Sequence, residues 1–390
     1  MMGVEEARAR LFAAARTLGA ETVPLADAVG RVLAADVVAL RDQPPFSASA
    51  MDGYAVRHDA LSAGTPLKLV GEAAAGRRFG RSIGAGEAVR IFTGAPAPDG
   101  ADTVLIQEDA EVSANTLTAR SLPAAGANIR RQALDFASGD ALLHAGEAVL
   151  PRHLALAASG GHAALSVARR PKVAFLATGD ELVPPGARPG PDAIVASTAP
   201  TLCAMARAVG AEPVDLGIVA DRREDIAARA REGLDNADVL VTLGGASVGD
   251  HDLVAPALGD LGISLDFWKV AVRPGKPLMF AARPLVMGLP GNPVSGVVCA
   301  IVFLLPLLRK LQGAEEPGPV IHNGVLGADL GQNGPRRDHM RARHTPDGLV
   351  PFKVQDSSML SVLAGADALI VRMPHDPPAE KGAACRWIAL

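Results

Sequence analysis

Three short polar segments rich in glycine follow apolar runs in the second half of the chain, and their residue types suit anion binding. They are TGDE at 178–181, GGASVGDHD at 244–252 and LPGNP at 289–293. Glycine lets backbone N–H groups approach an anion closely, and the start of a following helix favours negative charge. Tight turns also use glycine, so each segment alone has a purely structural interpretation. Three such segments after parallel strands predict one ligand crevice, because the carboxyl ends of those strands meet at one edge of a sheet.

The candidate ligand contacts in these segments are the positions nearest the expected strand ends. They are Thr178, Gly244, Gly245, Ser247, Gly249, Pro290 and Asn292. Helices are expected to begin near Asp250 and Asn292, with their positive ends directed at the crevice. The segments therefore predict a phosphate-bearing ligand.

Three basic residues lie close together in a chain that is acidic overall: Lys269, Arg273 and Lys276. If residues 265–272 form a strand, Lys269 and Arg273 share one face, because side chains on a strand alternate. A solvated basic surface would show the same pattern. Beside loops expected to bind anions, we interpret these residues as a clamp for phosphate or a tetrahedral oxyanion.

Carboxylates gather around the same crevice and suit a hard metal ion. They are Asp180, Glu181, Asp221, Asp250 and Asp252. Oxygen ligands of this kind hold Mg²⁺, which commonly bridges phosphates, although solvated turn carboxylates are the alternative. We interpret His251 as a turn residue and not as a catalytic base. The sequence has no GxSxG, HExxH or Walker A pattern, which disfavours a serine hydrolase, a zincin and a P-loop enzyme.

The elements that must position these residues alternate between strand and helix from about residue 171 to 312. Strands are expected at 173–177, 214–219 and 239–243, and helices after Ser197 and at 222–236. This alternation is typical of a doubly wound α/β domain with a parallel sheet covered on both faces.

The rest of the chain divides into three further parts. Two helical patterns precede residue 40, Pro44 and Pro45 then forbid helix, and β-branched runs at 67–70, 88–92 and 103–106 indicate a small β domain. A helix is expected from Pro151, and short strands follow residues 317–319. The predicted domains are a helical region at 1–50 with 135–170, a small β domain at 51–134, an α/β domain at 171–314 and a C-terminal β domain at 315–390.

Composition limits the classes of protein that fit. The 390 residues are 49% hydrophobic and 21% charged, with a net charge of −4. The overall charge therefore does not favour binding to nucleic acid or to an anionic membrane. The three cysteines, Cys203, Cys299 and Cys385, show neither disulfide nor zinc spacing. The amphipathic start is unlike a signal peptide, and the apolar window 297–308 is too short for a membrane span of about 20 residues. We expect a cytoplasmic protein with that window as a buried helix.

Motifs in the first half now join those of the α/β segment. PPFSASAMDGYA at 44–55, IFTGAP at 91–96, the Gln107-Glu108 pair and NIRR at 128–131 occur in that order. Together with the three loops, they closely resemble the molybdopterin molybdenumtransferase family, which is related to the C-terminal domain of gephyrin. The resemblance covers nearly the whole chain. It implies a multidomain α/β fold: a molybdopterin-binding α/β domain, a helical dimerisation region at 1–50 with 135–170, a small β domain and a C-terminal β barrel.

The resemblance also carries functional residues onto this chain by motif position. They are Asp52, Thr93, Asp135, Glu181, Asp221, Asp252, Lys269, Arg273, Lys276, Arg341 and Ser357. It implies that Asp52, Glu181, Asp221 and Asp252 are catalytic, and that Glu181, Asp221 and Asp252 hold Mg²⁺ or the pterin. Three positions depart from the family pattern: Ala133 and Asp356 stand where Gly is more common, and Arg273 stands where Lys is more common.

The implied reaction takes adenylyl-molybdopterin and molybdate, cleaves the phosphoanhydride and leaves molybdenum on the dithiolene, with AMP released. The implied assembly is a homodimer whose sites lie between subunits, so that Asp52 and Thr93 reach the partner's crevice. Transient contacts with the molybdopterin adenylyltransferase and with apoenzymes that receive the cofactor are also implied. No nucleic-acid or membrane partner is expected.

Two alternatives stay open from the sequence. The same α/β domain type serves molybdopterin adenylyltransferases, although the long N-terminal half disfavours that activity. A non-catalytic molybdopterin-binding scaffold is the other alternative, and the carboxylates Asp52, Glu181 and Asp252 disfavour it.

Overall fold

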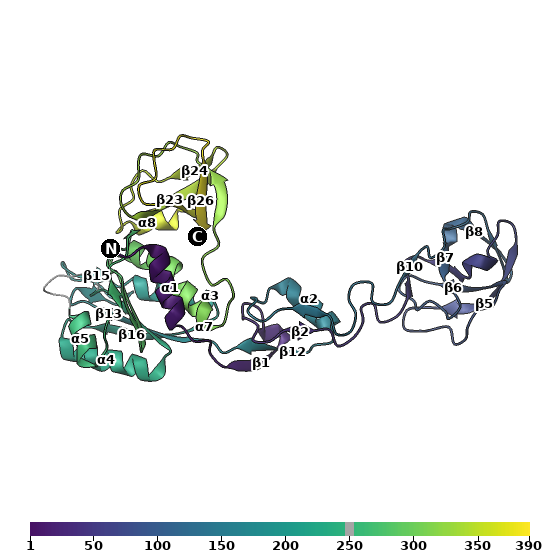
Figure 1. Cartoon of the computed structure of the whole chain (residues 1–390), viewed down its shortest axis with the longest axis horizontal. Helices are drawn as coiled ribbons and strands as arrows, with labels where there is room; N and C mark the ends of the chain where they lie inside the picture. The colour runs from purple at the N-terminus through teal and green to yellow at the C-terminus, as the bar shows by residue number, and fades with distance from the viewer. Residues whose placement is uncertain (246–252) are drawn as a thin grey trace.

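The structure is a computed structural model that describes residues 1–245 and 253–390. The molecule is elongated, with an α/β domain and a C-terminal β domain at one end and a small β domain at the other (Figure 1). A short region of paired strands and one helix joins the two ends.

The α/β domain is built on a six-stranded sheet in the order β16-β13-β17-β21-β20-β18. These strands are β13 (Lys172–Thr178), β16 (Glu212–Val219), β17 (Val239–Leu243), β18 (Phe267–Trp268), β20 (Met279–Ala282) and β21 (Leu285–Leu289). The first four in the sheet order are parallel, and β20 and β18 are antiparallel to their neighbours. The predicted strands at 173–177, 214–219 and 239–243 are therefore confirmed.

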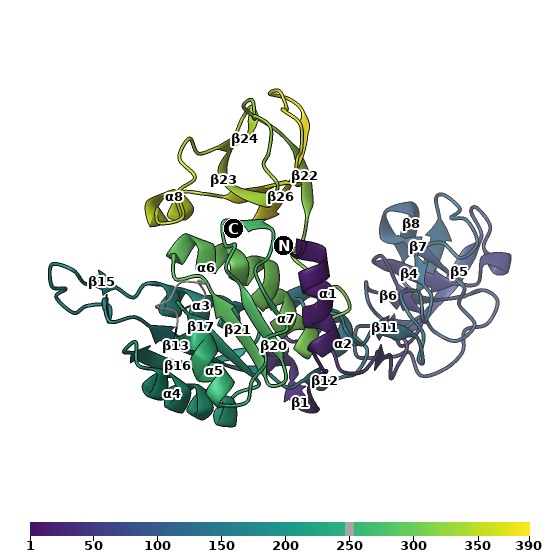
Figure 2. The ribbon, with the colours of Figure 1, turned by 60° about the vertical axis from the view of Figure 1, so that its left-hand side comes forward.

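Helices cover both faces of this sheet (Figure 2). One face carries α1 (Val4–Ala14), α3 (Thr198–Ala208), α6 (Pro293–Cys299) and α7 (Leu305–Leu311), and the other carries α4 (Arg223–Asn236) and α5 (Val254–Asp260). Alternate residues of β13 separate the two cores: Val173 and Phe175 face the first, and Ala174 and Leu176 the second. This is the doubly wound arrangement that the strand and helix alternation predicts.

One long apolar helix runs through the first core. Helices α6 and α7 are joined by a π-helical turn (Ala300–Leu304), which gives a continuous helix over Pro293–Leu311. Within the described residues it is the one helix long and apolar enough to cross a membrane, but 83% of its most apolar window is buried inside the protein. The expected buried helix at 297–308 is confirmed as a core helix.

The connecting region contains more strand than the sequence predicts. Its elements are β1 (Ala20–Pro24), β2 (Val37–Val38), β11 (Ala141–Leu143), α2 (Pro151–Ser159) and β12 (Ala164–Ala168). The second helical pattern expected before residue 40 is wrong, because β1 pairs with β12 and β2 with β11, and this long-range pairing overrides local helix propensity. Helix α1 leaves this region altogether: its Val4, Ala7 and Leu11 pack into the α/β core.

The small β domain is a second six-stranded sheet, in the order β7-β4-β6-β5-β9-β8. Its strands are β4 (Gly53–Val56), β5 (Pro66–Ala73), β6 (Glu87–Ile91), β7 (Thr103–Ile106), β8 (Ala110–Ser113) and β9 (Thr116–Ala119), with a separate pair β3 (Ala48–Ser49) and β10 (Ile129–Arg130).

The chain enters and leaves the small β domain at adjacent points. The Gln43 N–H donates to the Phe136 carbonyl over 2.9 Å. Nearby Ala133 has φ +56°, so the position where the family more often has Gly does require a left-handed backbone. A non-glycine residue there costs about 1 kcal/mol.

The C-terminal domain is a sheet in the order β19-β23-β25-β26-β22, with β24 paired to β23. Its elements are β22 (His322–Val325), β23 (Arg337–Thr345), β24 (Gly348–Pro351), α8 (Leu360–Ala364), β25 (Ala368–Arg372) and β26 (Ala384–Ala389). Its edge strand β19 (Val272–Arg273) comes from the α/β segment and pairs in parallel with β23. Leu349 of β24 also bridges Leu326, directly after β22, so the sheet curves back as a half-barrel, consistent with the predicted C-terminal β barrel.

Candidate functional site

The carboxyl ends of β13, β17 and β21 lie in direct contact. Gly244, after β17, donates its N–H to the Leu289 carbonyl over 3.2 Å. It has φ +94°, and a Cβ added there would lie 2.9 Å from the carbonyl oxygen of buried Thr178. A Cβ on Gly291 would in turn lie 3.5 Å from Gly244 Cα. The backbone therefore needs glycine at 244, and the three predicted loops converge at one place.

The remaining predicted contacts from these loops divide into two groups. Gly245 has φ +61° and is partly exposed, and Pro290 is buried directly after β21. Ser247, Gly249 and Asp252, with Asp250 and His251, lie outside the described residues, so their predicted roles remain predictions.

Carboxylates border the crevice beside the ends of β13 and β16. The Asp221 N–H donates to Asp180 Oδ1 over 3.0 Å, and a Cβ on Gly179 would lie 2.6 Å from Glu181 Oε2. Burial, and then the nearby charges of Asp180 and Glu181, raise the pKa of the Asp221 carboxyl. In the part of the chain that the structure describes, no three His, Cys, Asp or Glu side chains form a metal-binding group. The predicted magnesium ligands include Asp252, so that set stays a prediction.

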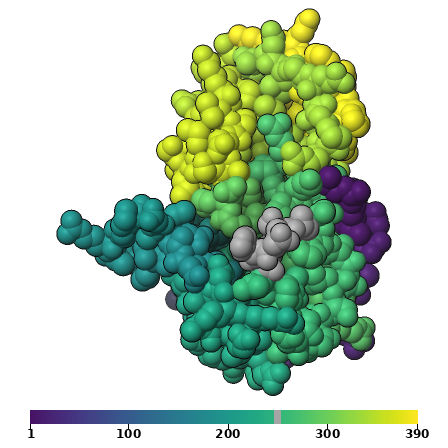
Figure 3. Space-filling view, turned by 90° about the vertical axis from the view of Figure 1, so that its left-hand side faces the viewer, coloured from purple at the N-terminus to yellow at the C-terminus, as the bar shows by residue number. Residues whose placement is uncertain are grey.

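Figure 3 shows the same end of the molecule, with the C-terminal domain above the α/β domain. The segment that contains β14 (Leu182–Val183) and β15 (Ile194–Val195) projects from the α/β domain directly after Glu181.

The C-terminal domain meets the crevice at the start of α6. Asn292 precedes this helix, and its Nδ2 donates to Ser357 Oγ over 3.0 Å. The Val294 N–H donates to the Ser357 carbonyl over 3.3 Å. Asp356 is turned toward Ser358, whose N–H and hydroxyl donate to its carboxylate over 2.8 and 2.6 Å, and these bonds lower the pKa of Asp356. Ser357 thus keeps its contact with the helix start despite the acidic neighbour.

The predicted basic clamp is assembled differently from the sequence expectation. Residues 265–272 are not one strand: β18 ends at Trp268, and Lys269 has φ +135°. Arg273 lies on β19, in the sheet of the C-terminal domain. Lys269 and Arg273 therefore do not share a strand face, because the positive φ breaks the strand and another sheet captures its continuation. Lys269 and Lys276 are both exposed.

Arg273 instead joins a charged cluster with Asp338 and Arg341 on β23. Arg273 Nη1 lies 3.3 Å from Asp338 Oδ2, and Asp338 is nearly buried. Burial raises the pKa of Asp338, against the opposing effect of Arg273 and Arg341. Arg341 is only 1% exposed, its Nη2 donates to the Asp356 carbonyl over 3.0 Å, and burial lowers its pKa. Asp338 is not predicted from the sequence; its signal is a single acid among the four arginines of RRDHMRAR at 336–343.

Asp52 directly precedes β4 and Thr93 follows β6, and Figure 1 shows both strands in the small β domain, at the opposite end of the molecule from the α/β domain. Asp52 Oδ1 accepts the Thr93 N–H over 2.7 Å and the Thr93 hydroxyl over 2.8 Å, and these two bonds lower the pKa of Asp52. Asp135 lies in the connection to the small β domain, where its N–H donates to the Gln43 carbonyl over 2.9 Å. Within one chain, the structure does not bring these three residues to the predicted site.

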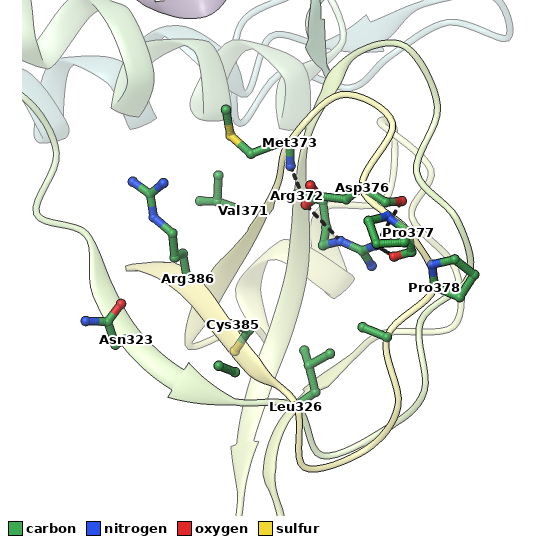
Figure 4. Close-up of a pocket in the computed structure, with 12 residues that line it drawn as sticks. Asn323, Leu326, Val371, Arg372, Met373, Asp376, Pro377, Pro378, Cys385 and Arg386 are labelled. Atoms are coloured by element: carbon green, nitrogen blue, oxygen red, sulfur yellow. Dashed lines mark hydrogen bonds and ion pairs between the residues drawn. The ribbon is translucent and has the colours of Figure 1, made fainter.

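Hollows also lie outside the crevice. One of about 410 Å³ is in the C-terminal domain, where Arg372 pairs with Asp376 at 3.3 Å beside Val371 and Arg386 (Figure 4). None of the site residues predicted from the sequence lines this hollow.

Comparisons with family models agree along the chain. Residues 2–161 match a model described as "MoeA N-terminal region (domain I and II)". Residues 174–310 match "Probable molybdopterin binding domain", and residues 323–390 match "MoeA C-terminal region (domain IV)".

Individual relatives agree with the family models. The chain is 36% identical over 367 residues to a protein named molybdopterin molybdenumtransferase from Nostoc sp., covering 90% of this chain and 84% of the relative. It is also 36% identical over 370 residues to molybdopterin molybdenumtransferase 2 of Mycobacterium tuberculosis H37Rv, covering 91% of each. A solved molybdopterin biosynthesis MoeA protein from Pyrococcus horikoshii superposes with a TM-score of 0.85 at 28% identity, over 100% of this chain and 99% of that one.

Proposed function

The chain belongs to the molybdopterin molybdenumtransferase family, and from this premise we propose that its crevice inserts molybdenum from molybdate into adenylyl-molybdopterin and releases AMP. The observation that carries the proposal is the meeting of three strand ends with Ser357 at the start of α6. Glycine-rich loops at the strand ends, with arginines beside them, suit a substrate that has phosphate and molybdate oxygens.

Positioning and charge perform the chemistry in this proposal. Lys269, Arg273, Lys276, Arg341 and Ser357 hold molybdate or phosphate oxygens. Positive groups fixed before the reaction stabilise the charge that develops as the phosphoanhydride breaks. Asp338 holds Arg273 beside the crevice through their ion pair.

The acidic side of the crevice fits a divalent cation. Asp180 and Glu181 raise the pKa of Asp221 together with burial, and a cation among these carboxylates would relieve their repulsion. Glu181, Asp221 and Asp252 are the residues that would hold Mg²⁺, which supplies positive charge to phosphate oxygens when bound.

The far residues complete the site in a homodimer. Asp52 and Thr93 are fixed to each other but lie at the other end of their own chain. Two-fold pairing of elongated chains would bring Asp52, Thr93 and Asp135 of one subunit to the crevice of the other. The same proposal places the dimer in the cytoplasm, with transient contacts to the adenylyltransferase and to cofactor-accepting apoenzymes.

The two alternatives make different products. A molybdopterin adenylyltransferase would consume ATP and release pyrophosphate, and a scaffold would bind molybdopterin without turnover. The relatives matched over most of the chain carry the transferase name, which does not favour either alternative.

AMP release tests the function directly. Purified protein with adenylyl-molybdopterin is expected to release AMP at a rate that depends on added molybdate, measured by chromatography. Asp221→Asn is expected to abolish the release, whereas Glu224→Gln, an exposed acid on α4, serves as the matched control. AMP release at a rate independent of molybdate would contradict the proposed function. Binding of adenylyl-molybdopterin without AMP release would also contradict it.

A further inference from the structure

A cavity of about 660 Å³ lies where the long apolar helix meets the C-terminal domain, apart from the crevice. Its apolar wall on the α/β side consists of Met205, Val297, Ile301 and Leu305. Its wall on the C-terminal side consists of Pro319, Val320, Leu363, Ala366, Ile388, Ala389 and Leu390. Volumes of this size and apolar linings of this kind are typical of sites for small molecules.

One cation lines this cavity without a counter-ion. Arg309, in the last turn of α7, makes no side-chain hydrogen bond or ion pair with the described residues, and no described side chain that lines the cavity is acidic. Burial lowers the pKa of Arg309. Burying an unpaired charge is costly, so an anion beside this guanidinium would be stabilised.

Arginines of low exposure elsewhere in the described chain have partners: Arg341, only 1% exposed, donates to the Asp356 carbonyl. Arg31, Arg337 and Arg372 each form an ion pair, with Glu21, Glu5 and Asp376. The cavity's second polar group, His322, is held in place by stacking on Trp387 with ring centroids 4.6 Å apart. An apolar cavity with one unpaired cation at its wall favours a ligand with one anionic group and an apolar body.

We propose that this cavity binds a small amphipathic organic acid, with its apolar tail along Val297, Ile301 and Leu305 and its carboxylate on Arg309. The assignment goes beyond the proposed function and does not depend on it. The same continuous helix begins at the crevice, where Asn292 contacts Ser357. A ligand held between this helix and the C-terminal domain therefore restrains the two walls that also border the crevice.

Calorimetric titration of the full-length protein with decanoate tests the proposal, with decanol as the neutral probe. Decanoate is expected to bind wild type, and Arg309→Gln to weaken decanoate binding about tenfold while decanol binding is unchanged. Arg309→Lys should retain most of the decanoate affinity. Lys310→Gln is the matched control, because Lys310 is adjacent on α7 and does not line the cavity.

A cavity-filling variant separates the site from non-specific binding. Ala366→Trp is expected to abolish binding of both probes without lowering the melting temperature. Three results would overturn the proposal: no decanoate binding by wild type at millimolar concentration, equal weakening of both probes by Arg309→Gln, or a dimer that Ala366→Trp dissociates while neither probe binds. The last result would assign this face to a second copy of the chain.

Discussion

The two ends of the molecule place their candidate functional residues by different means. At the end that contains the α/β domain, the near end, Thr178, Asp221 and Gly244 come from distant parts of the sequence and lie together because parallel strands end at one edge, and Ser357 of the C-terminal domain joins them at the start of α6. At the far end, Asp52 and Thr93 meet through two local hydrogen bonds in the small β domain. The crevice residues and the Asp52–Thr93 pair are each held in place without the other, and we call each set a half-site. The proposed reaction needs both half-sites together, and a single elongated chain keeps them apart.

Mixed dimers test that comparison with the largest expected effect. Asp52→Ala and Asp221→Ala are each expected to reduce molybdenum insertion about a hundredfold or more, because each removes one half-site from both crevices of a symmetric dimer. After subunit exchange at equal concentration, half of the dimers carry one intact site, so about a quarter of the wild-type rate should return.

The control for this experiment is Asp59→Ala, which removes an exposed carboxylate from the same small β domain. Exchange must be verified by mass spectrometry of differently tagged subunits. Mixed dimers as inactive as both parents would show that Asp52 acts within its own chain or not at all.

Acid should separate the two ends, because His339 is buried in the C-terminal domain, whereas His58 of the small β domain is only partly buried. Burial, and then the charge of Arg337, lower the pKa of His339 from 6.5 to about 3. The unfolded chain binds this proton below pH 6.5 and the folded chain does not, so stability falls with pH from 6.5 toward 3, by at most about 1.4 kcal/mol per pH unit.

The aromatic residues supply separate probes for this acid experiment. The two tryptophans, Trp268 and Trp387, lie at the near end, and the single tyrosine, Tyr54, lies in the small β domain. Tryptophan fluorescence in urea should report the loss of stability, and His339→Gln should flatten its pH dependence. Equal slopes in wild type and variant would remove His339 as the cause.

Substitution of Arg273 in the proposed oxyanion clamp should have a smaller effect, on the molybdate affinity of the near half-site. Arg273→Ala is expected to weaken molybdate binding about tenfold, because the side chain is half exposed and a charge-assisted contact is worth about 1.5 kcal/mol there. Arg273→Lys should largely restore the affinity, and Arg222→Ala, an exposed arginine at the start of α4, should leave it unchanged. Titration at fixed ionic strength measures both. Unchanged affinity in Arg273→Ala would leave Lys269 and Arg341 as the candidates.

The smallest effect concerns the far half-site. Thr93→Ala removes the hydroxyl that donates to Asp52 and keeps the backbone N–H, so the pKa of Asp52 should rise toward its ordinary value of 3.8. Asp52 remains ionised at neutral pH, and insertion there should fall only a few-fold. Carbon-13 NMR titration of the Asp52 carboxyl measures the change. Thr93→Ser should keep the wild-type pKa, and an unchanged pKa in Thr93→Ala would refute the role of the hydroxyl.

The convergence of the loops at 178–181, 244–245 and 289–293 was predictable, because strand and helix alternation implies a parallel sheet and fixes where its strands end. The break at Lys269 was not, because residues 265–272 have the local composition of a strand, and only the C-terminal sheet captures Val272 and Arg273. Likewise, residues 20–24 become strand β1 through pairing with residues 164–168, a contact that no local window contains. The Asp338 cluster depends on the same capture, which explains why the sequence alone did not reveal it.

The adjacent entry and exit of the small β domain has an evolutionary consequence. Because Gln43 and Phe136 are hydrogen-bonded neighbours, everything between them is an insertion whose removal would leave the path of the remaining chain almost unchanged. A single genetic event that inserts or removes this module would leave the rest of the fold undisturbed. Selection on mutations in the module would then act through the proposed chemistry and hardly at all through the folding of the other domains.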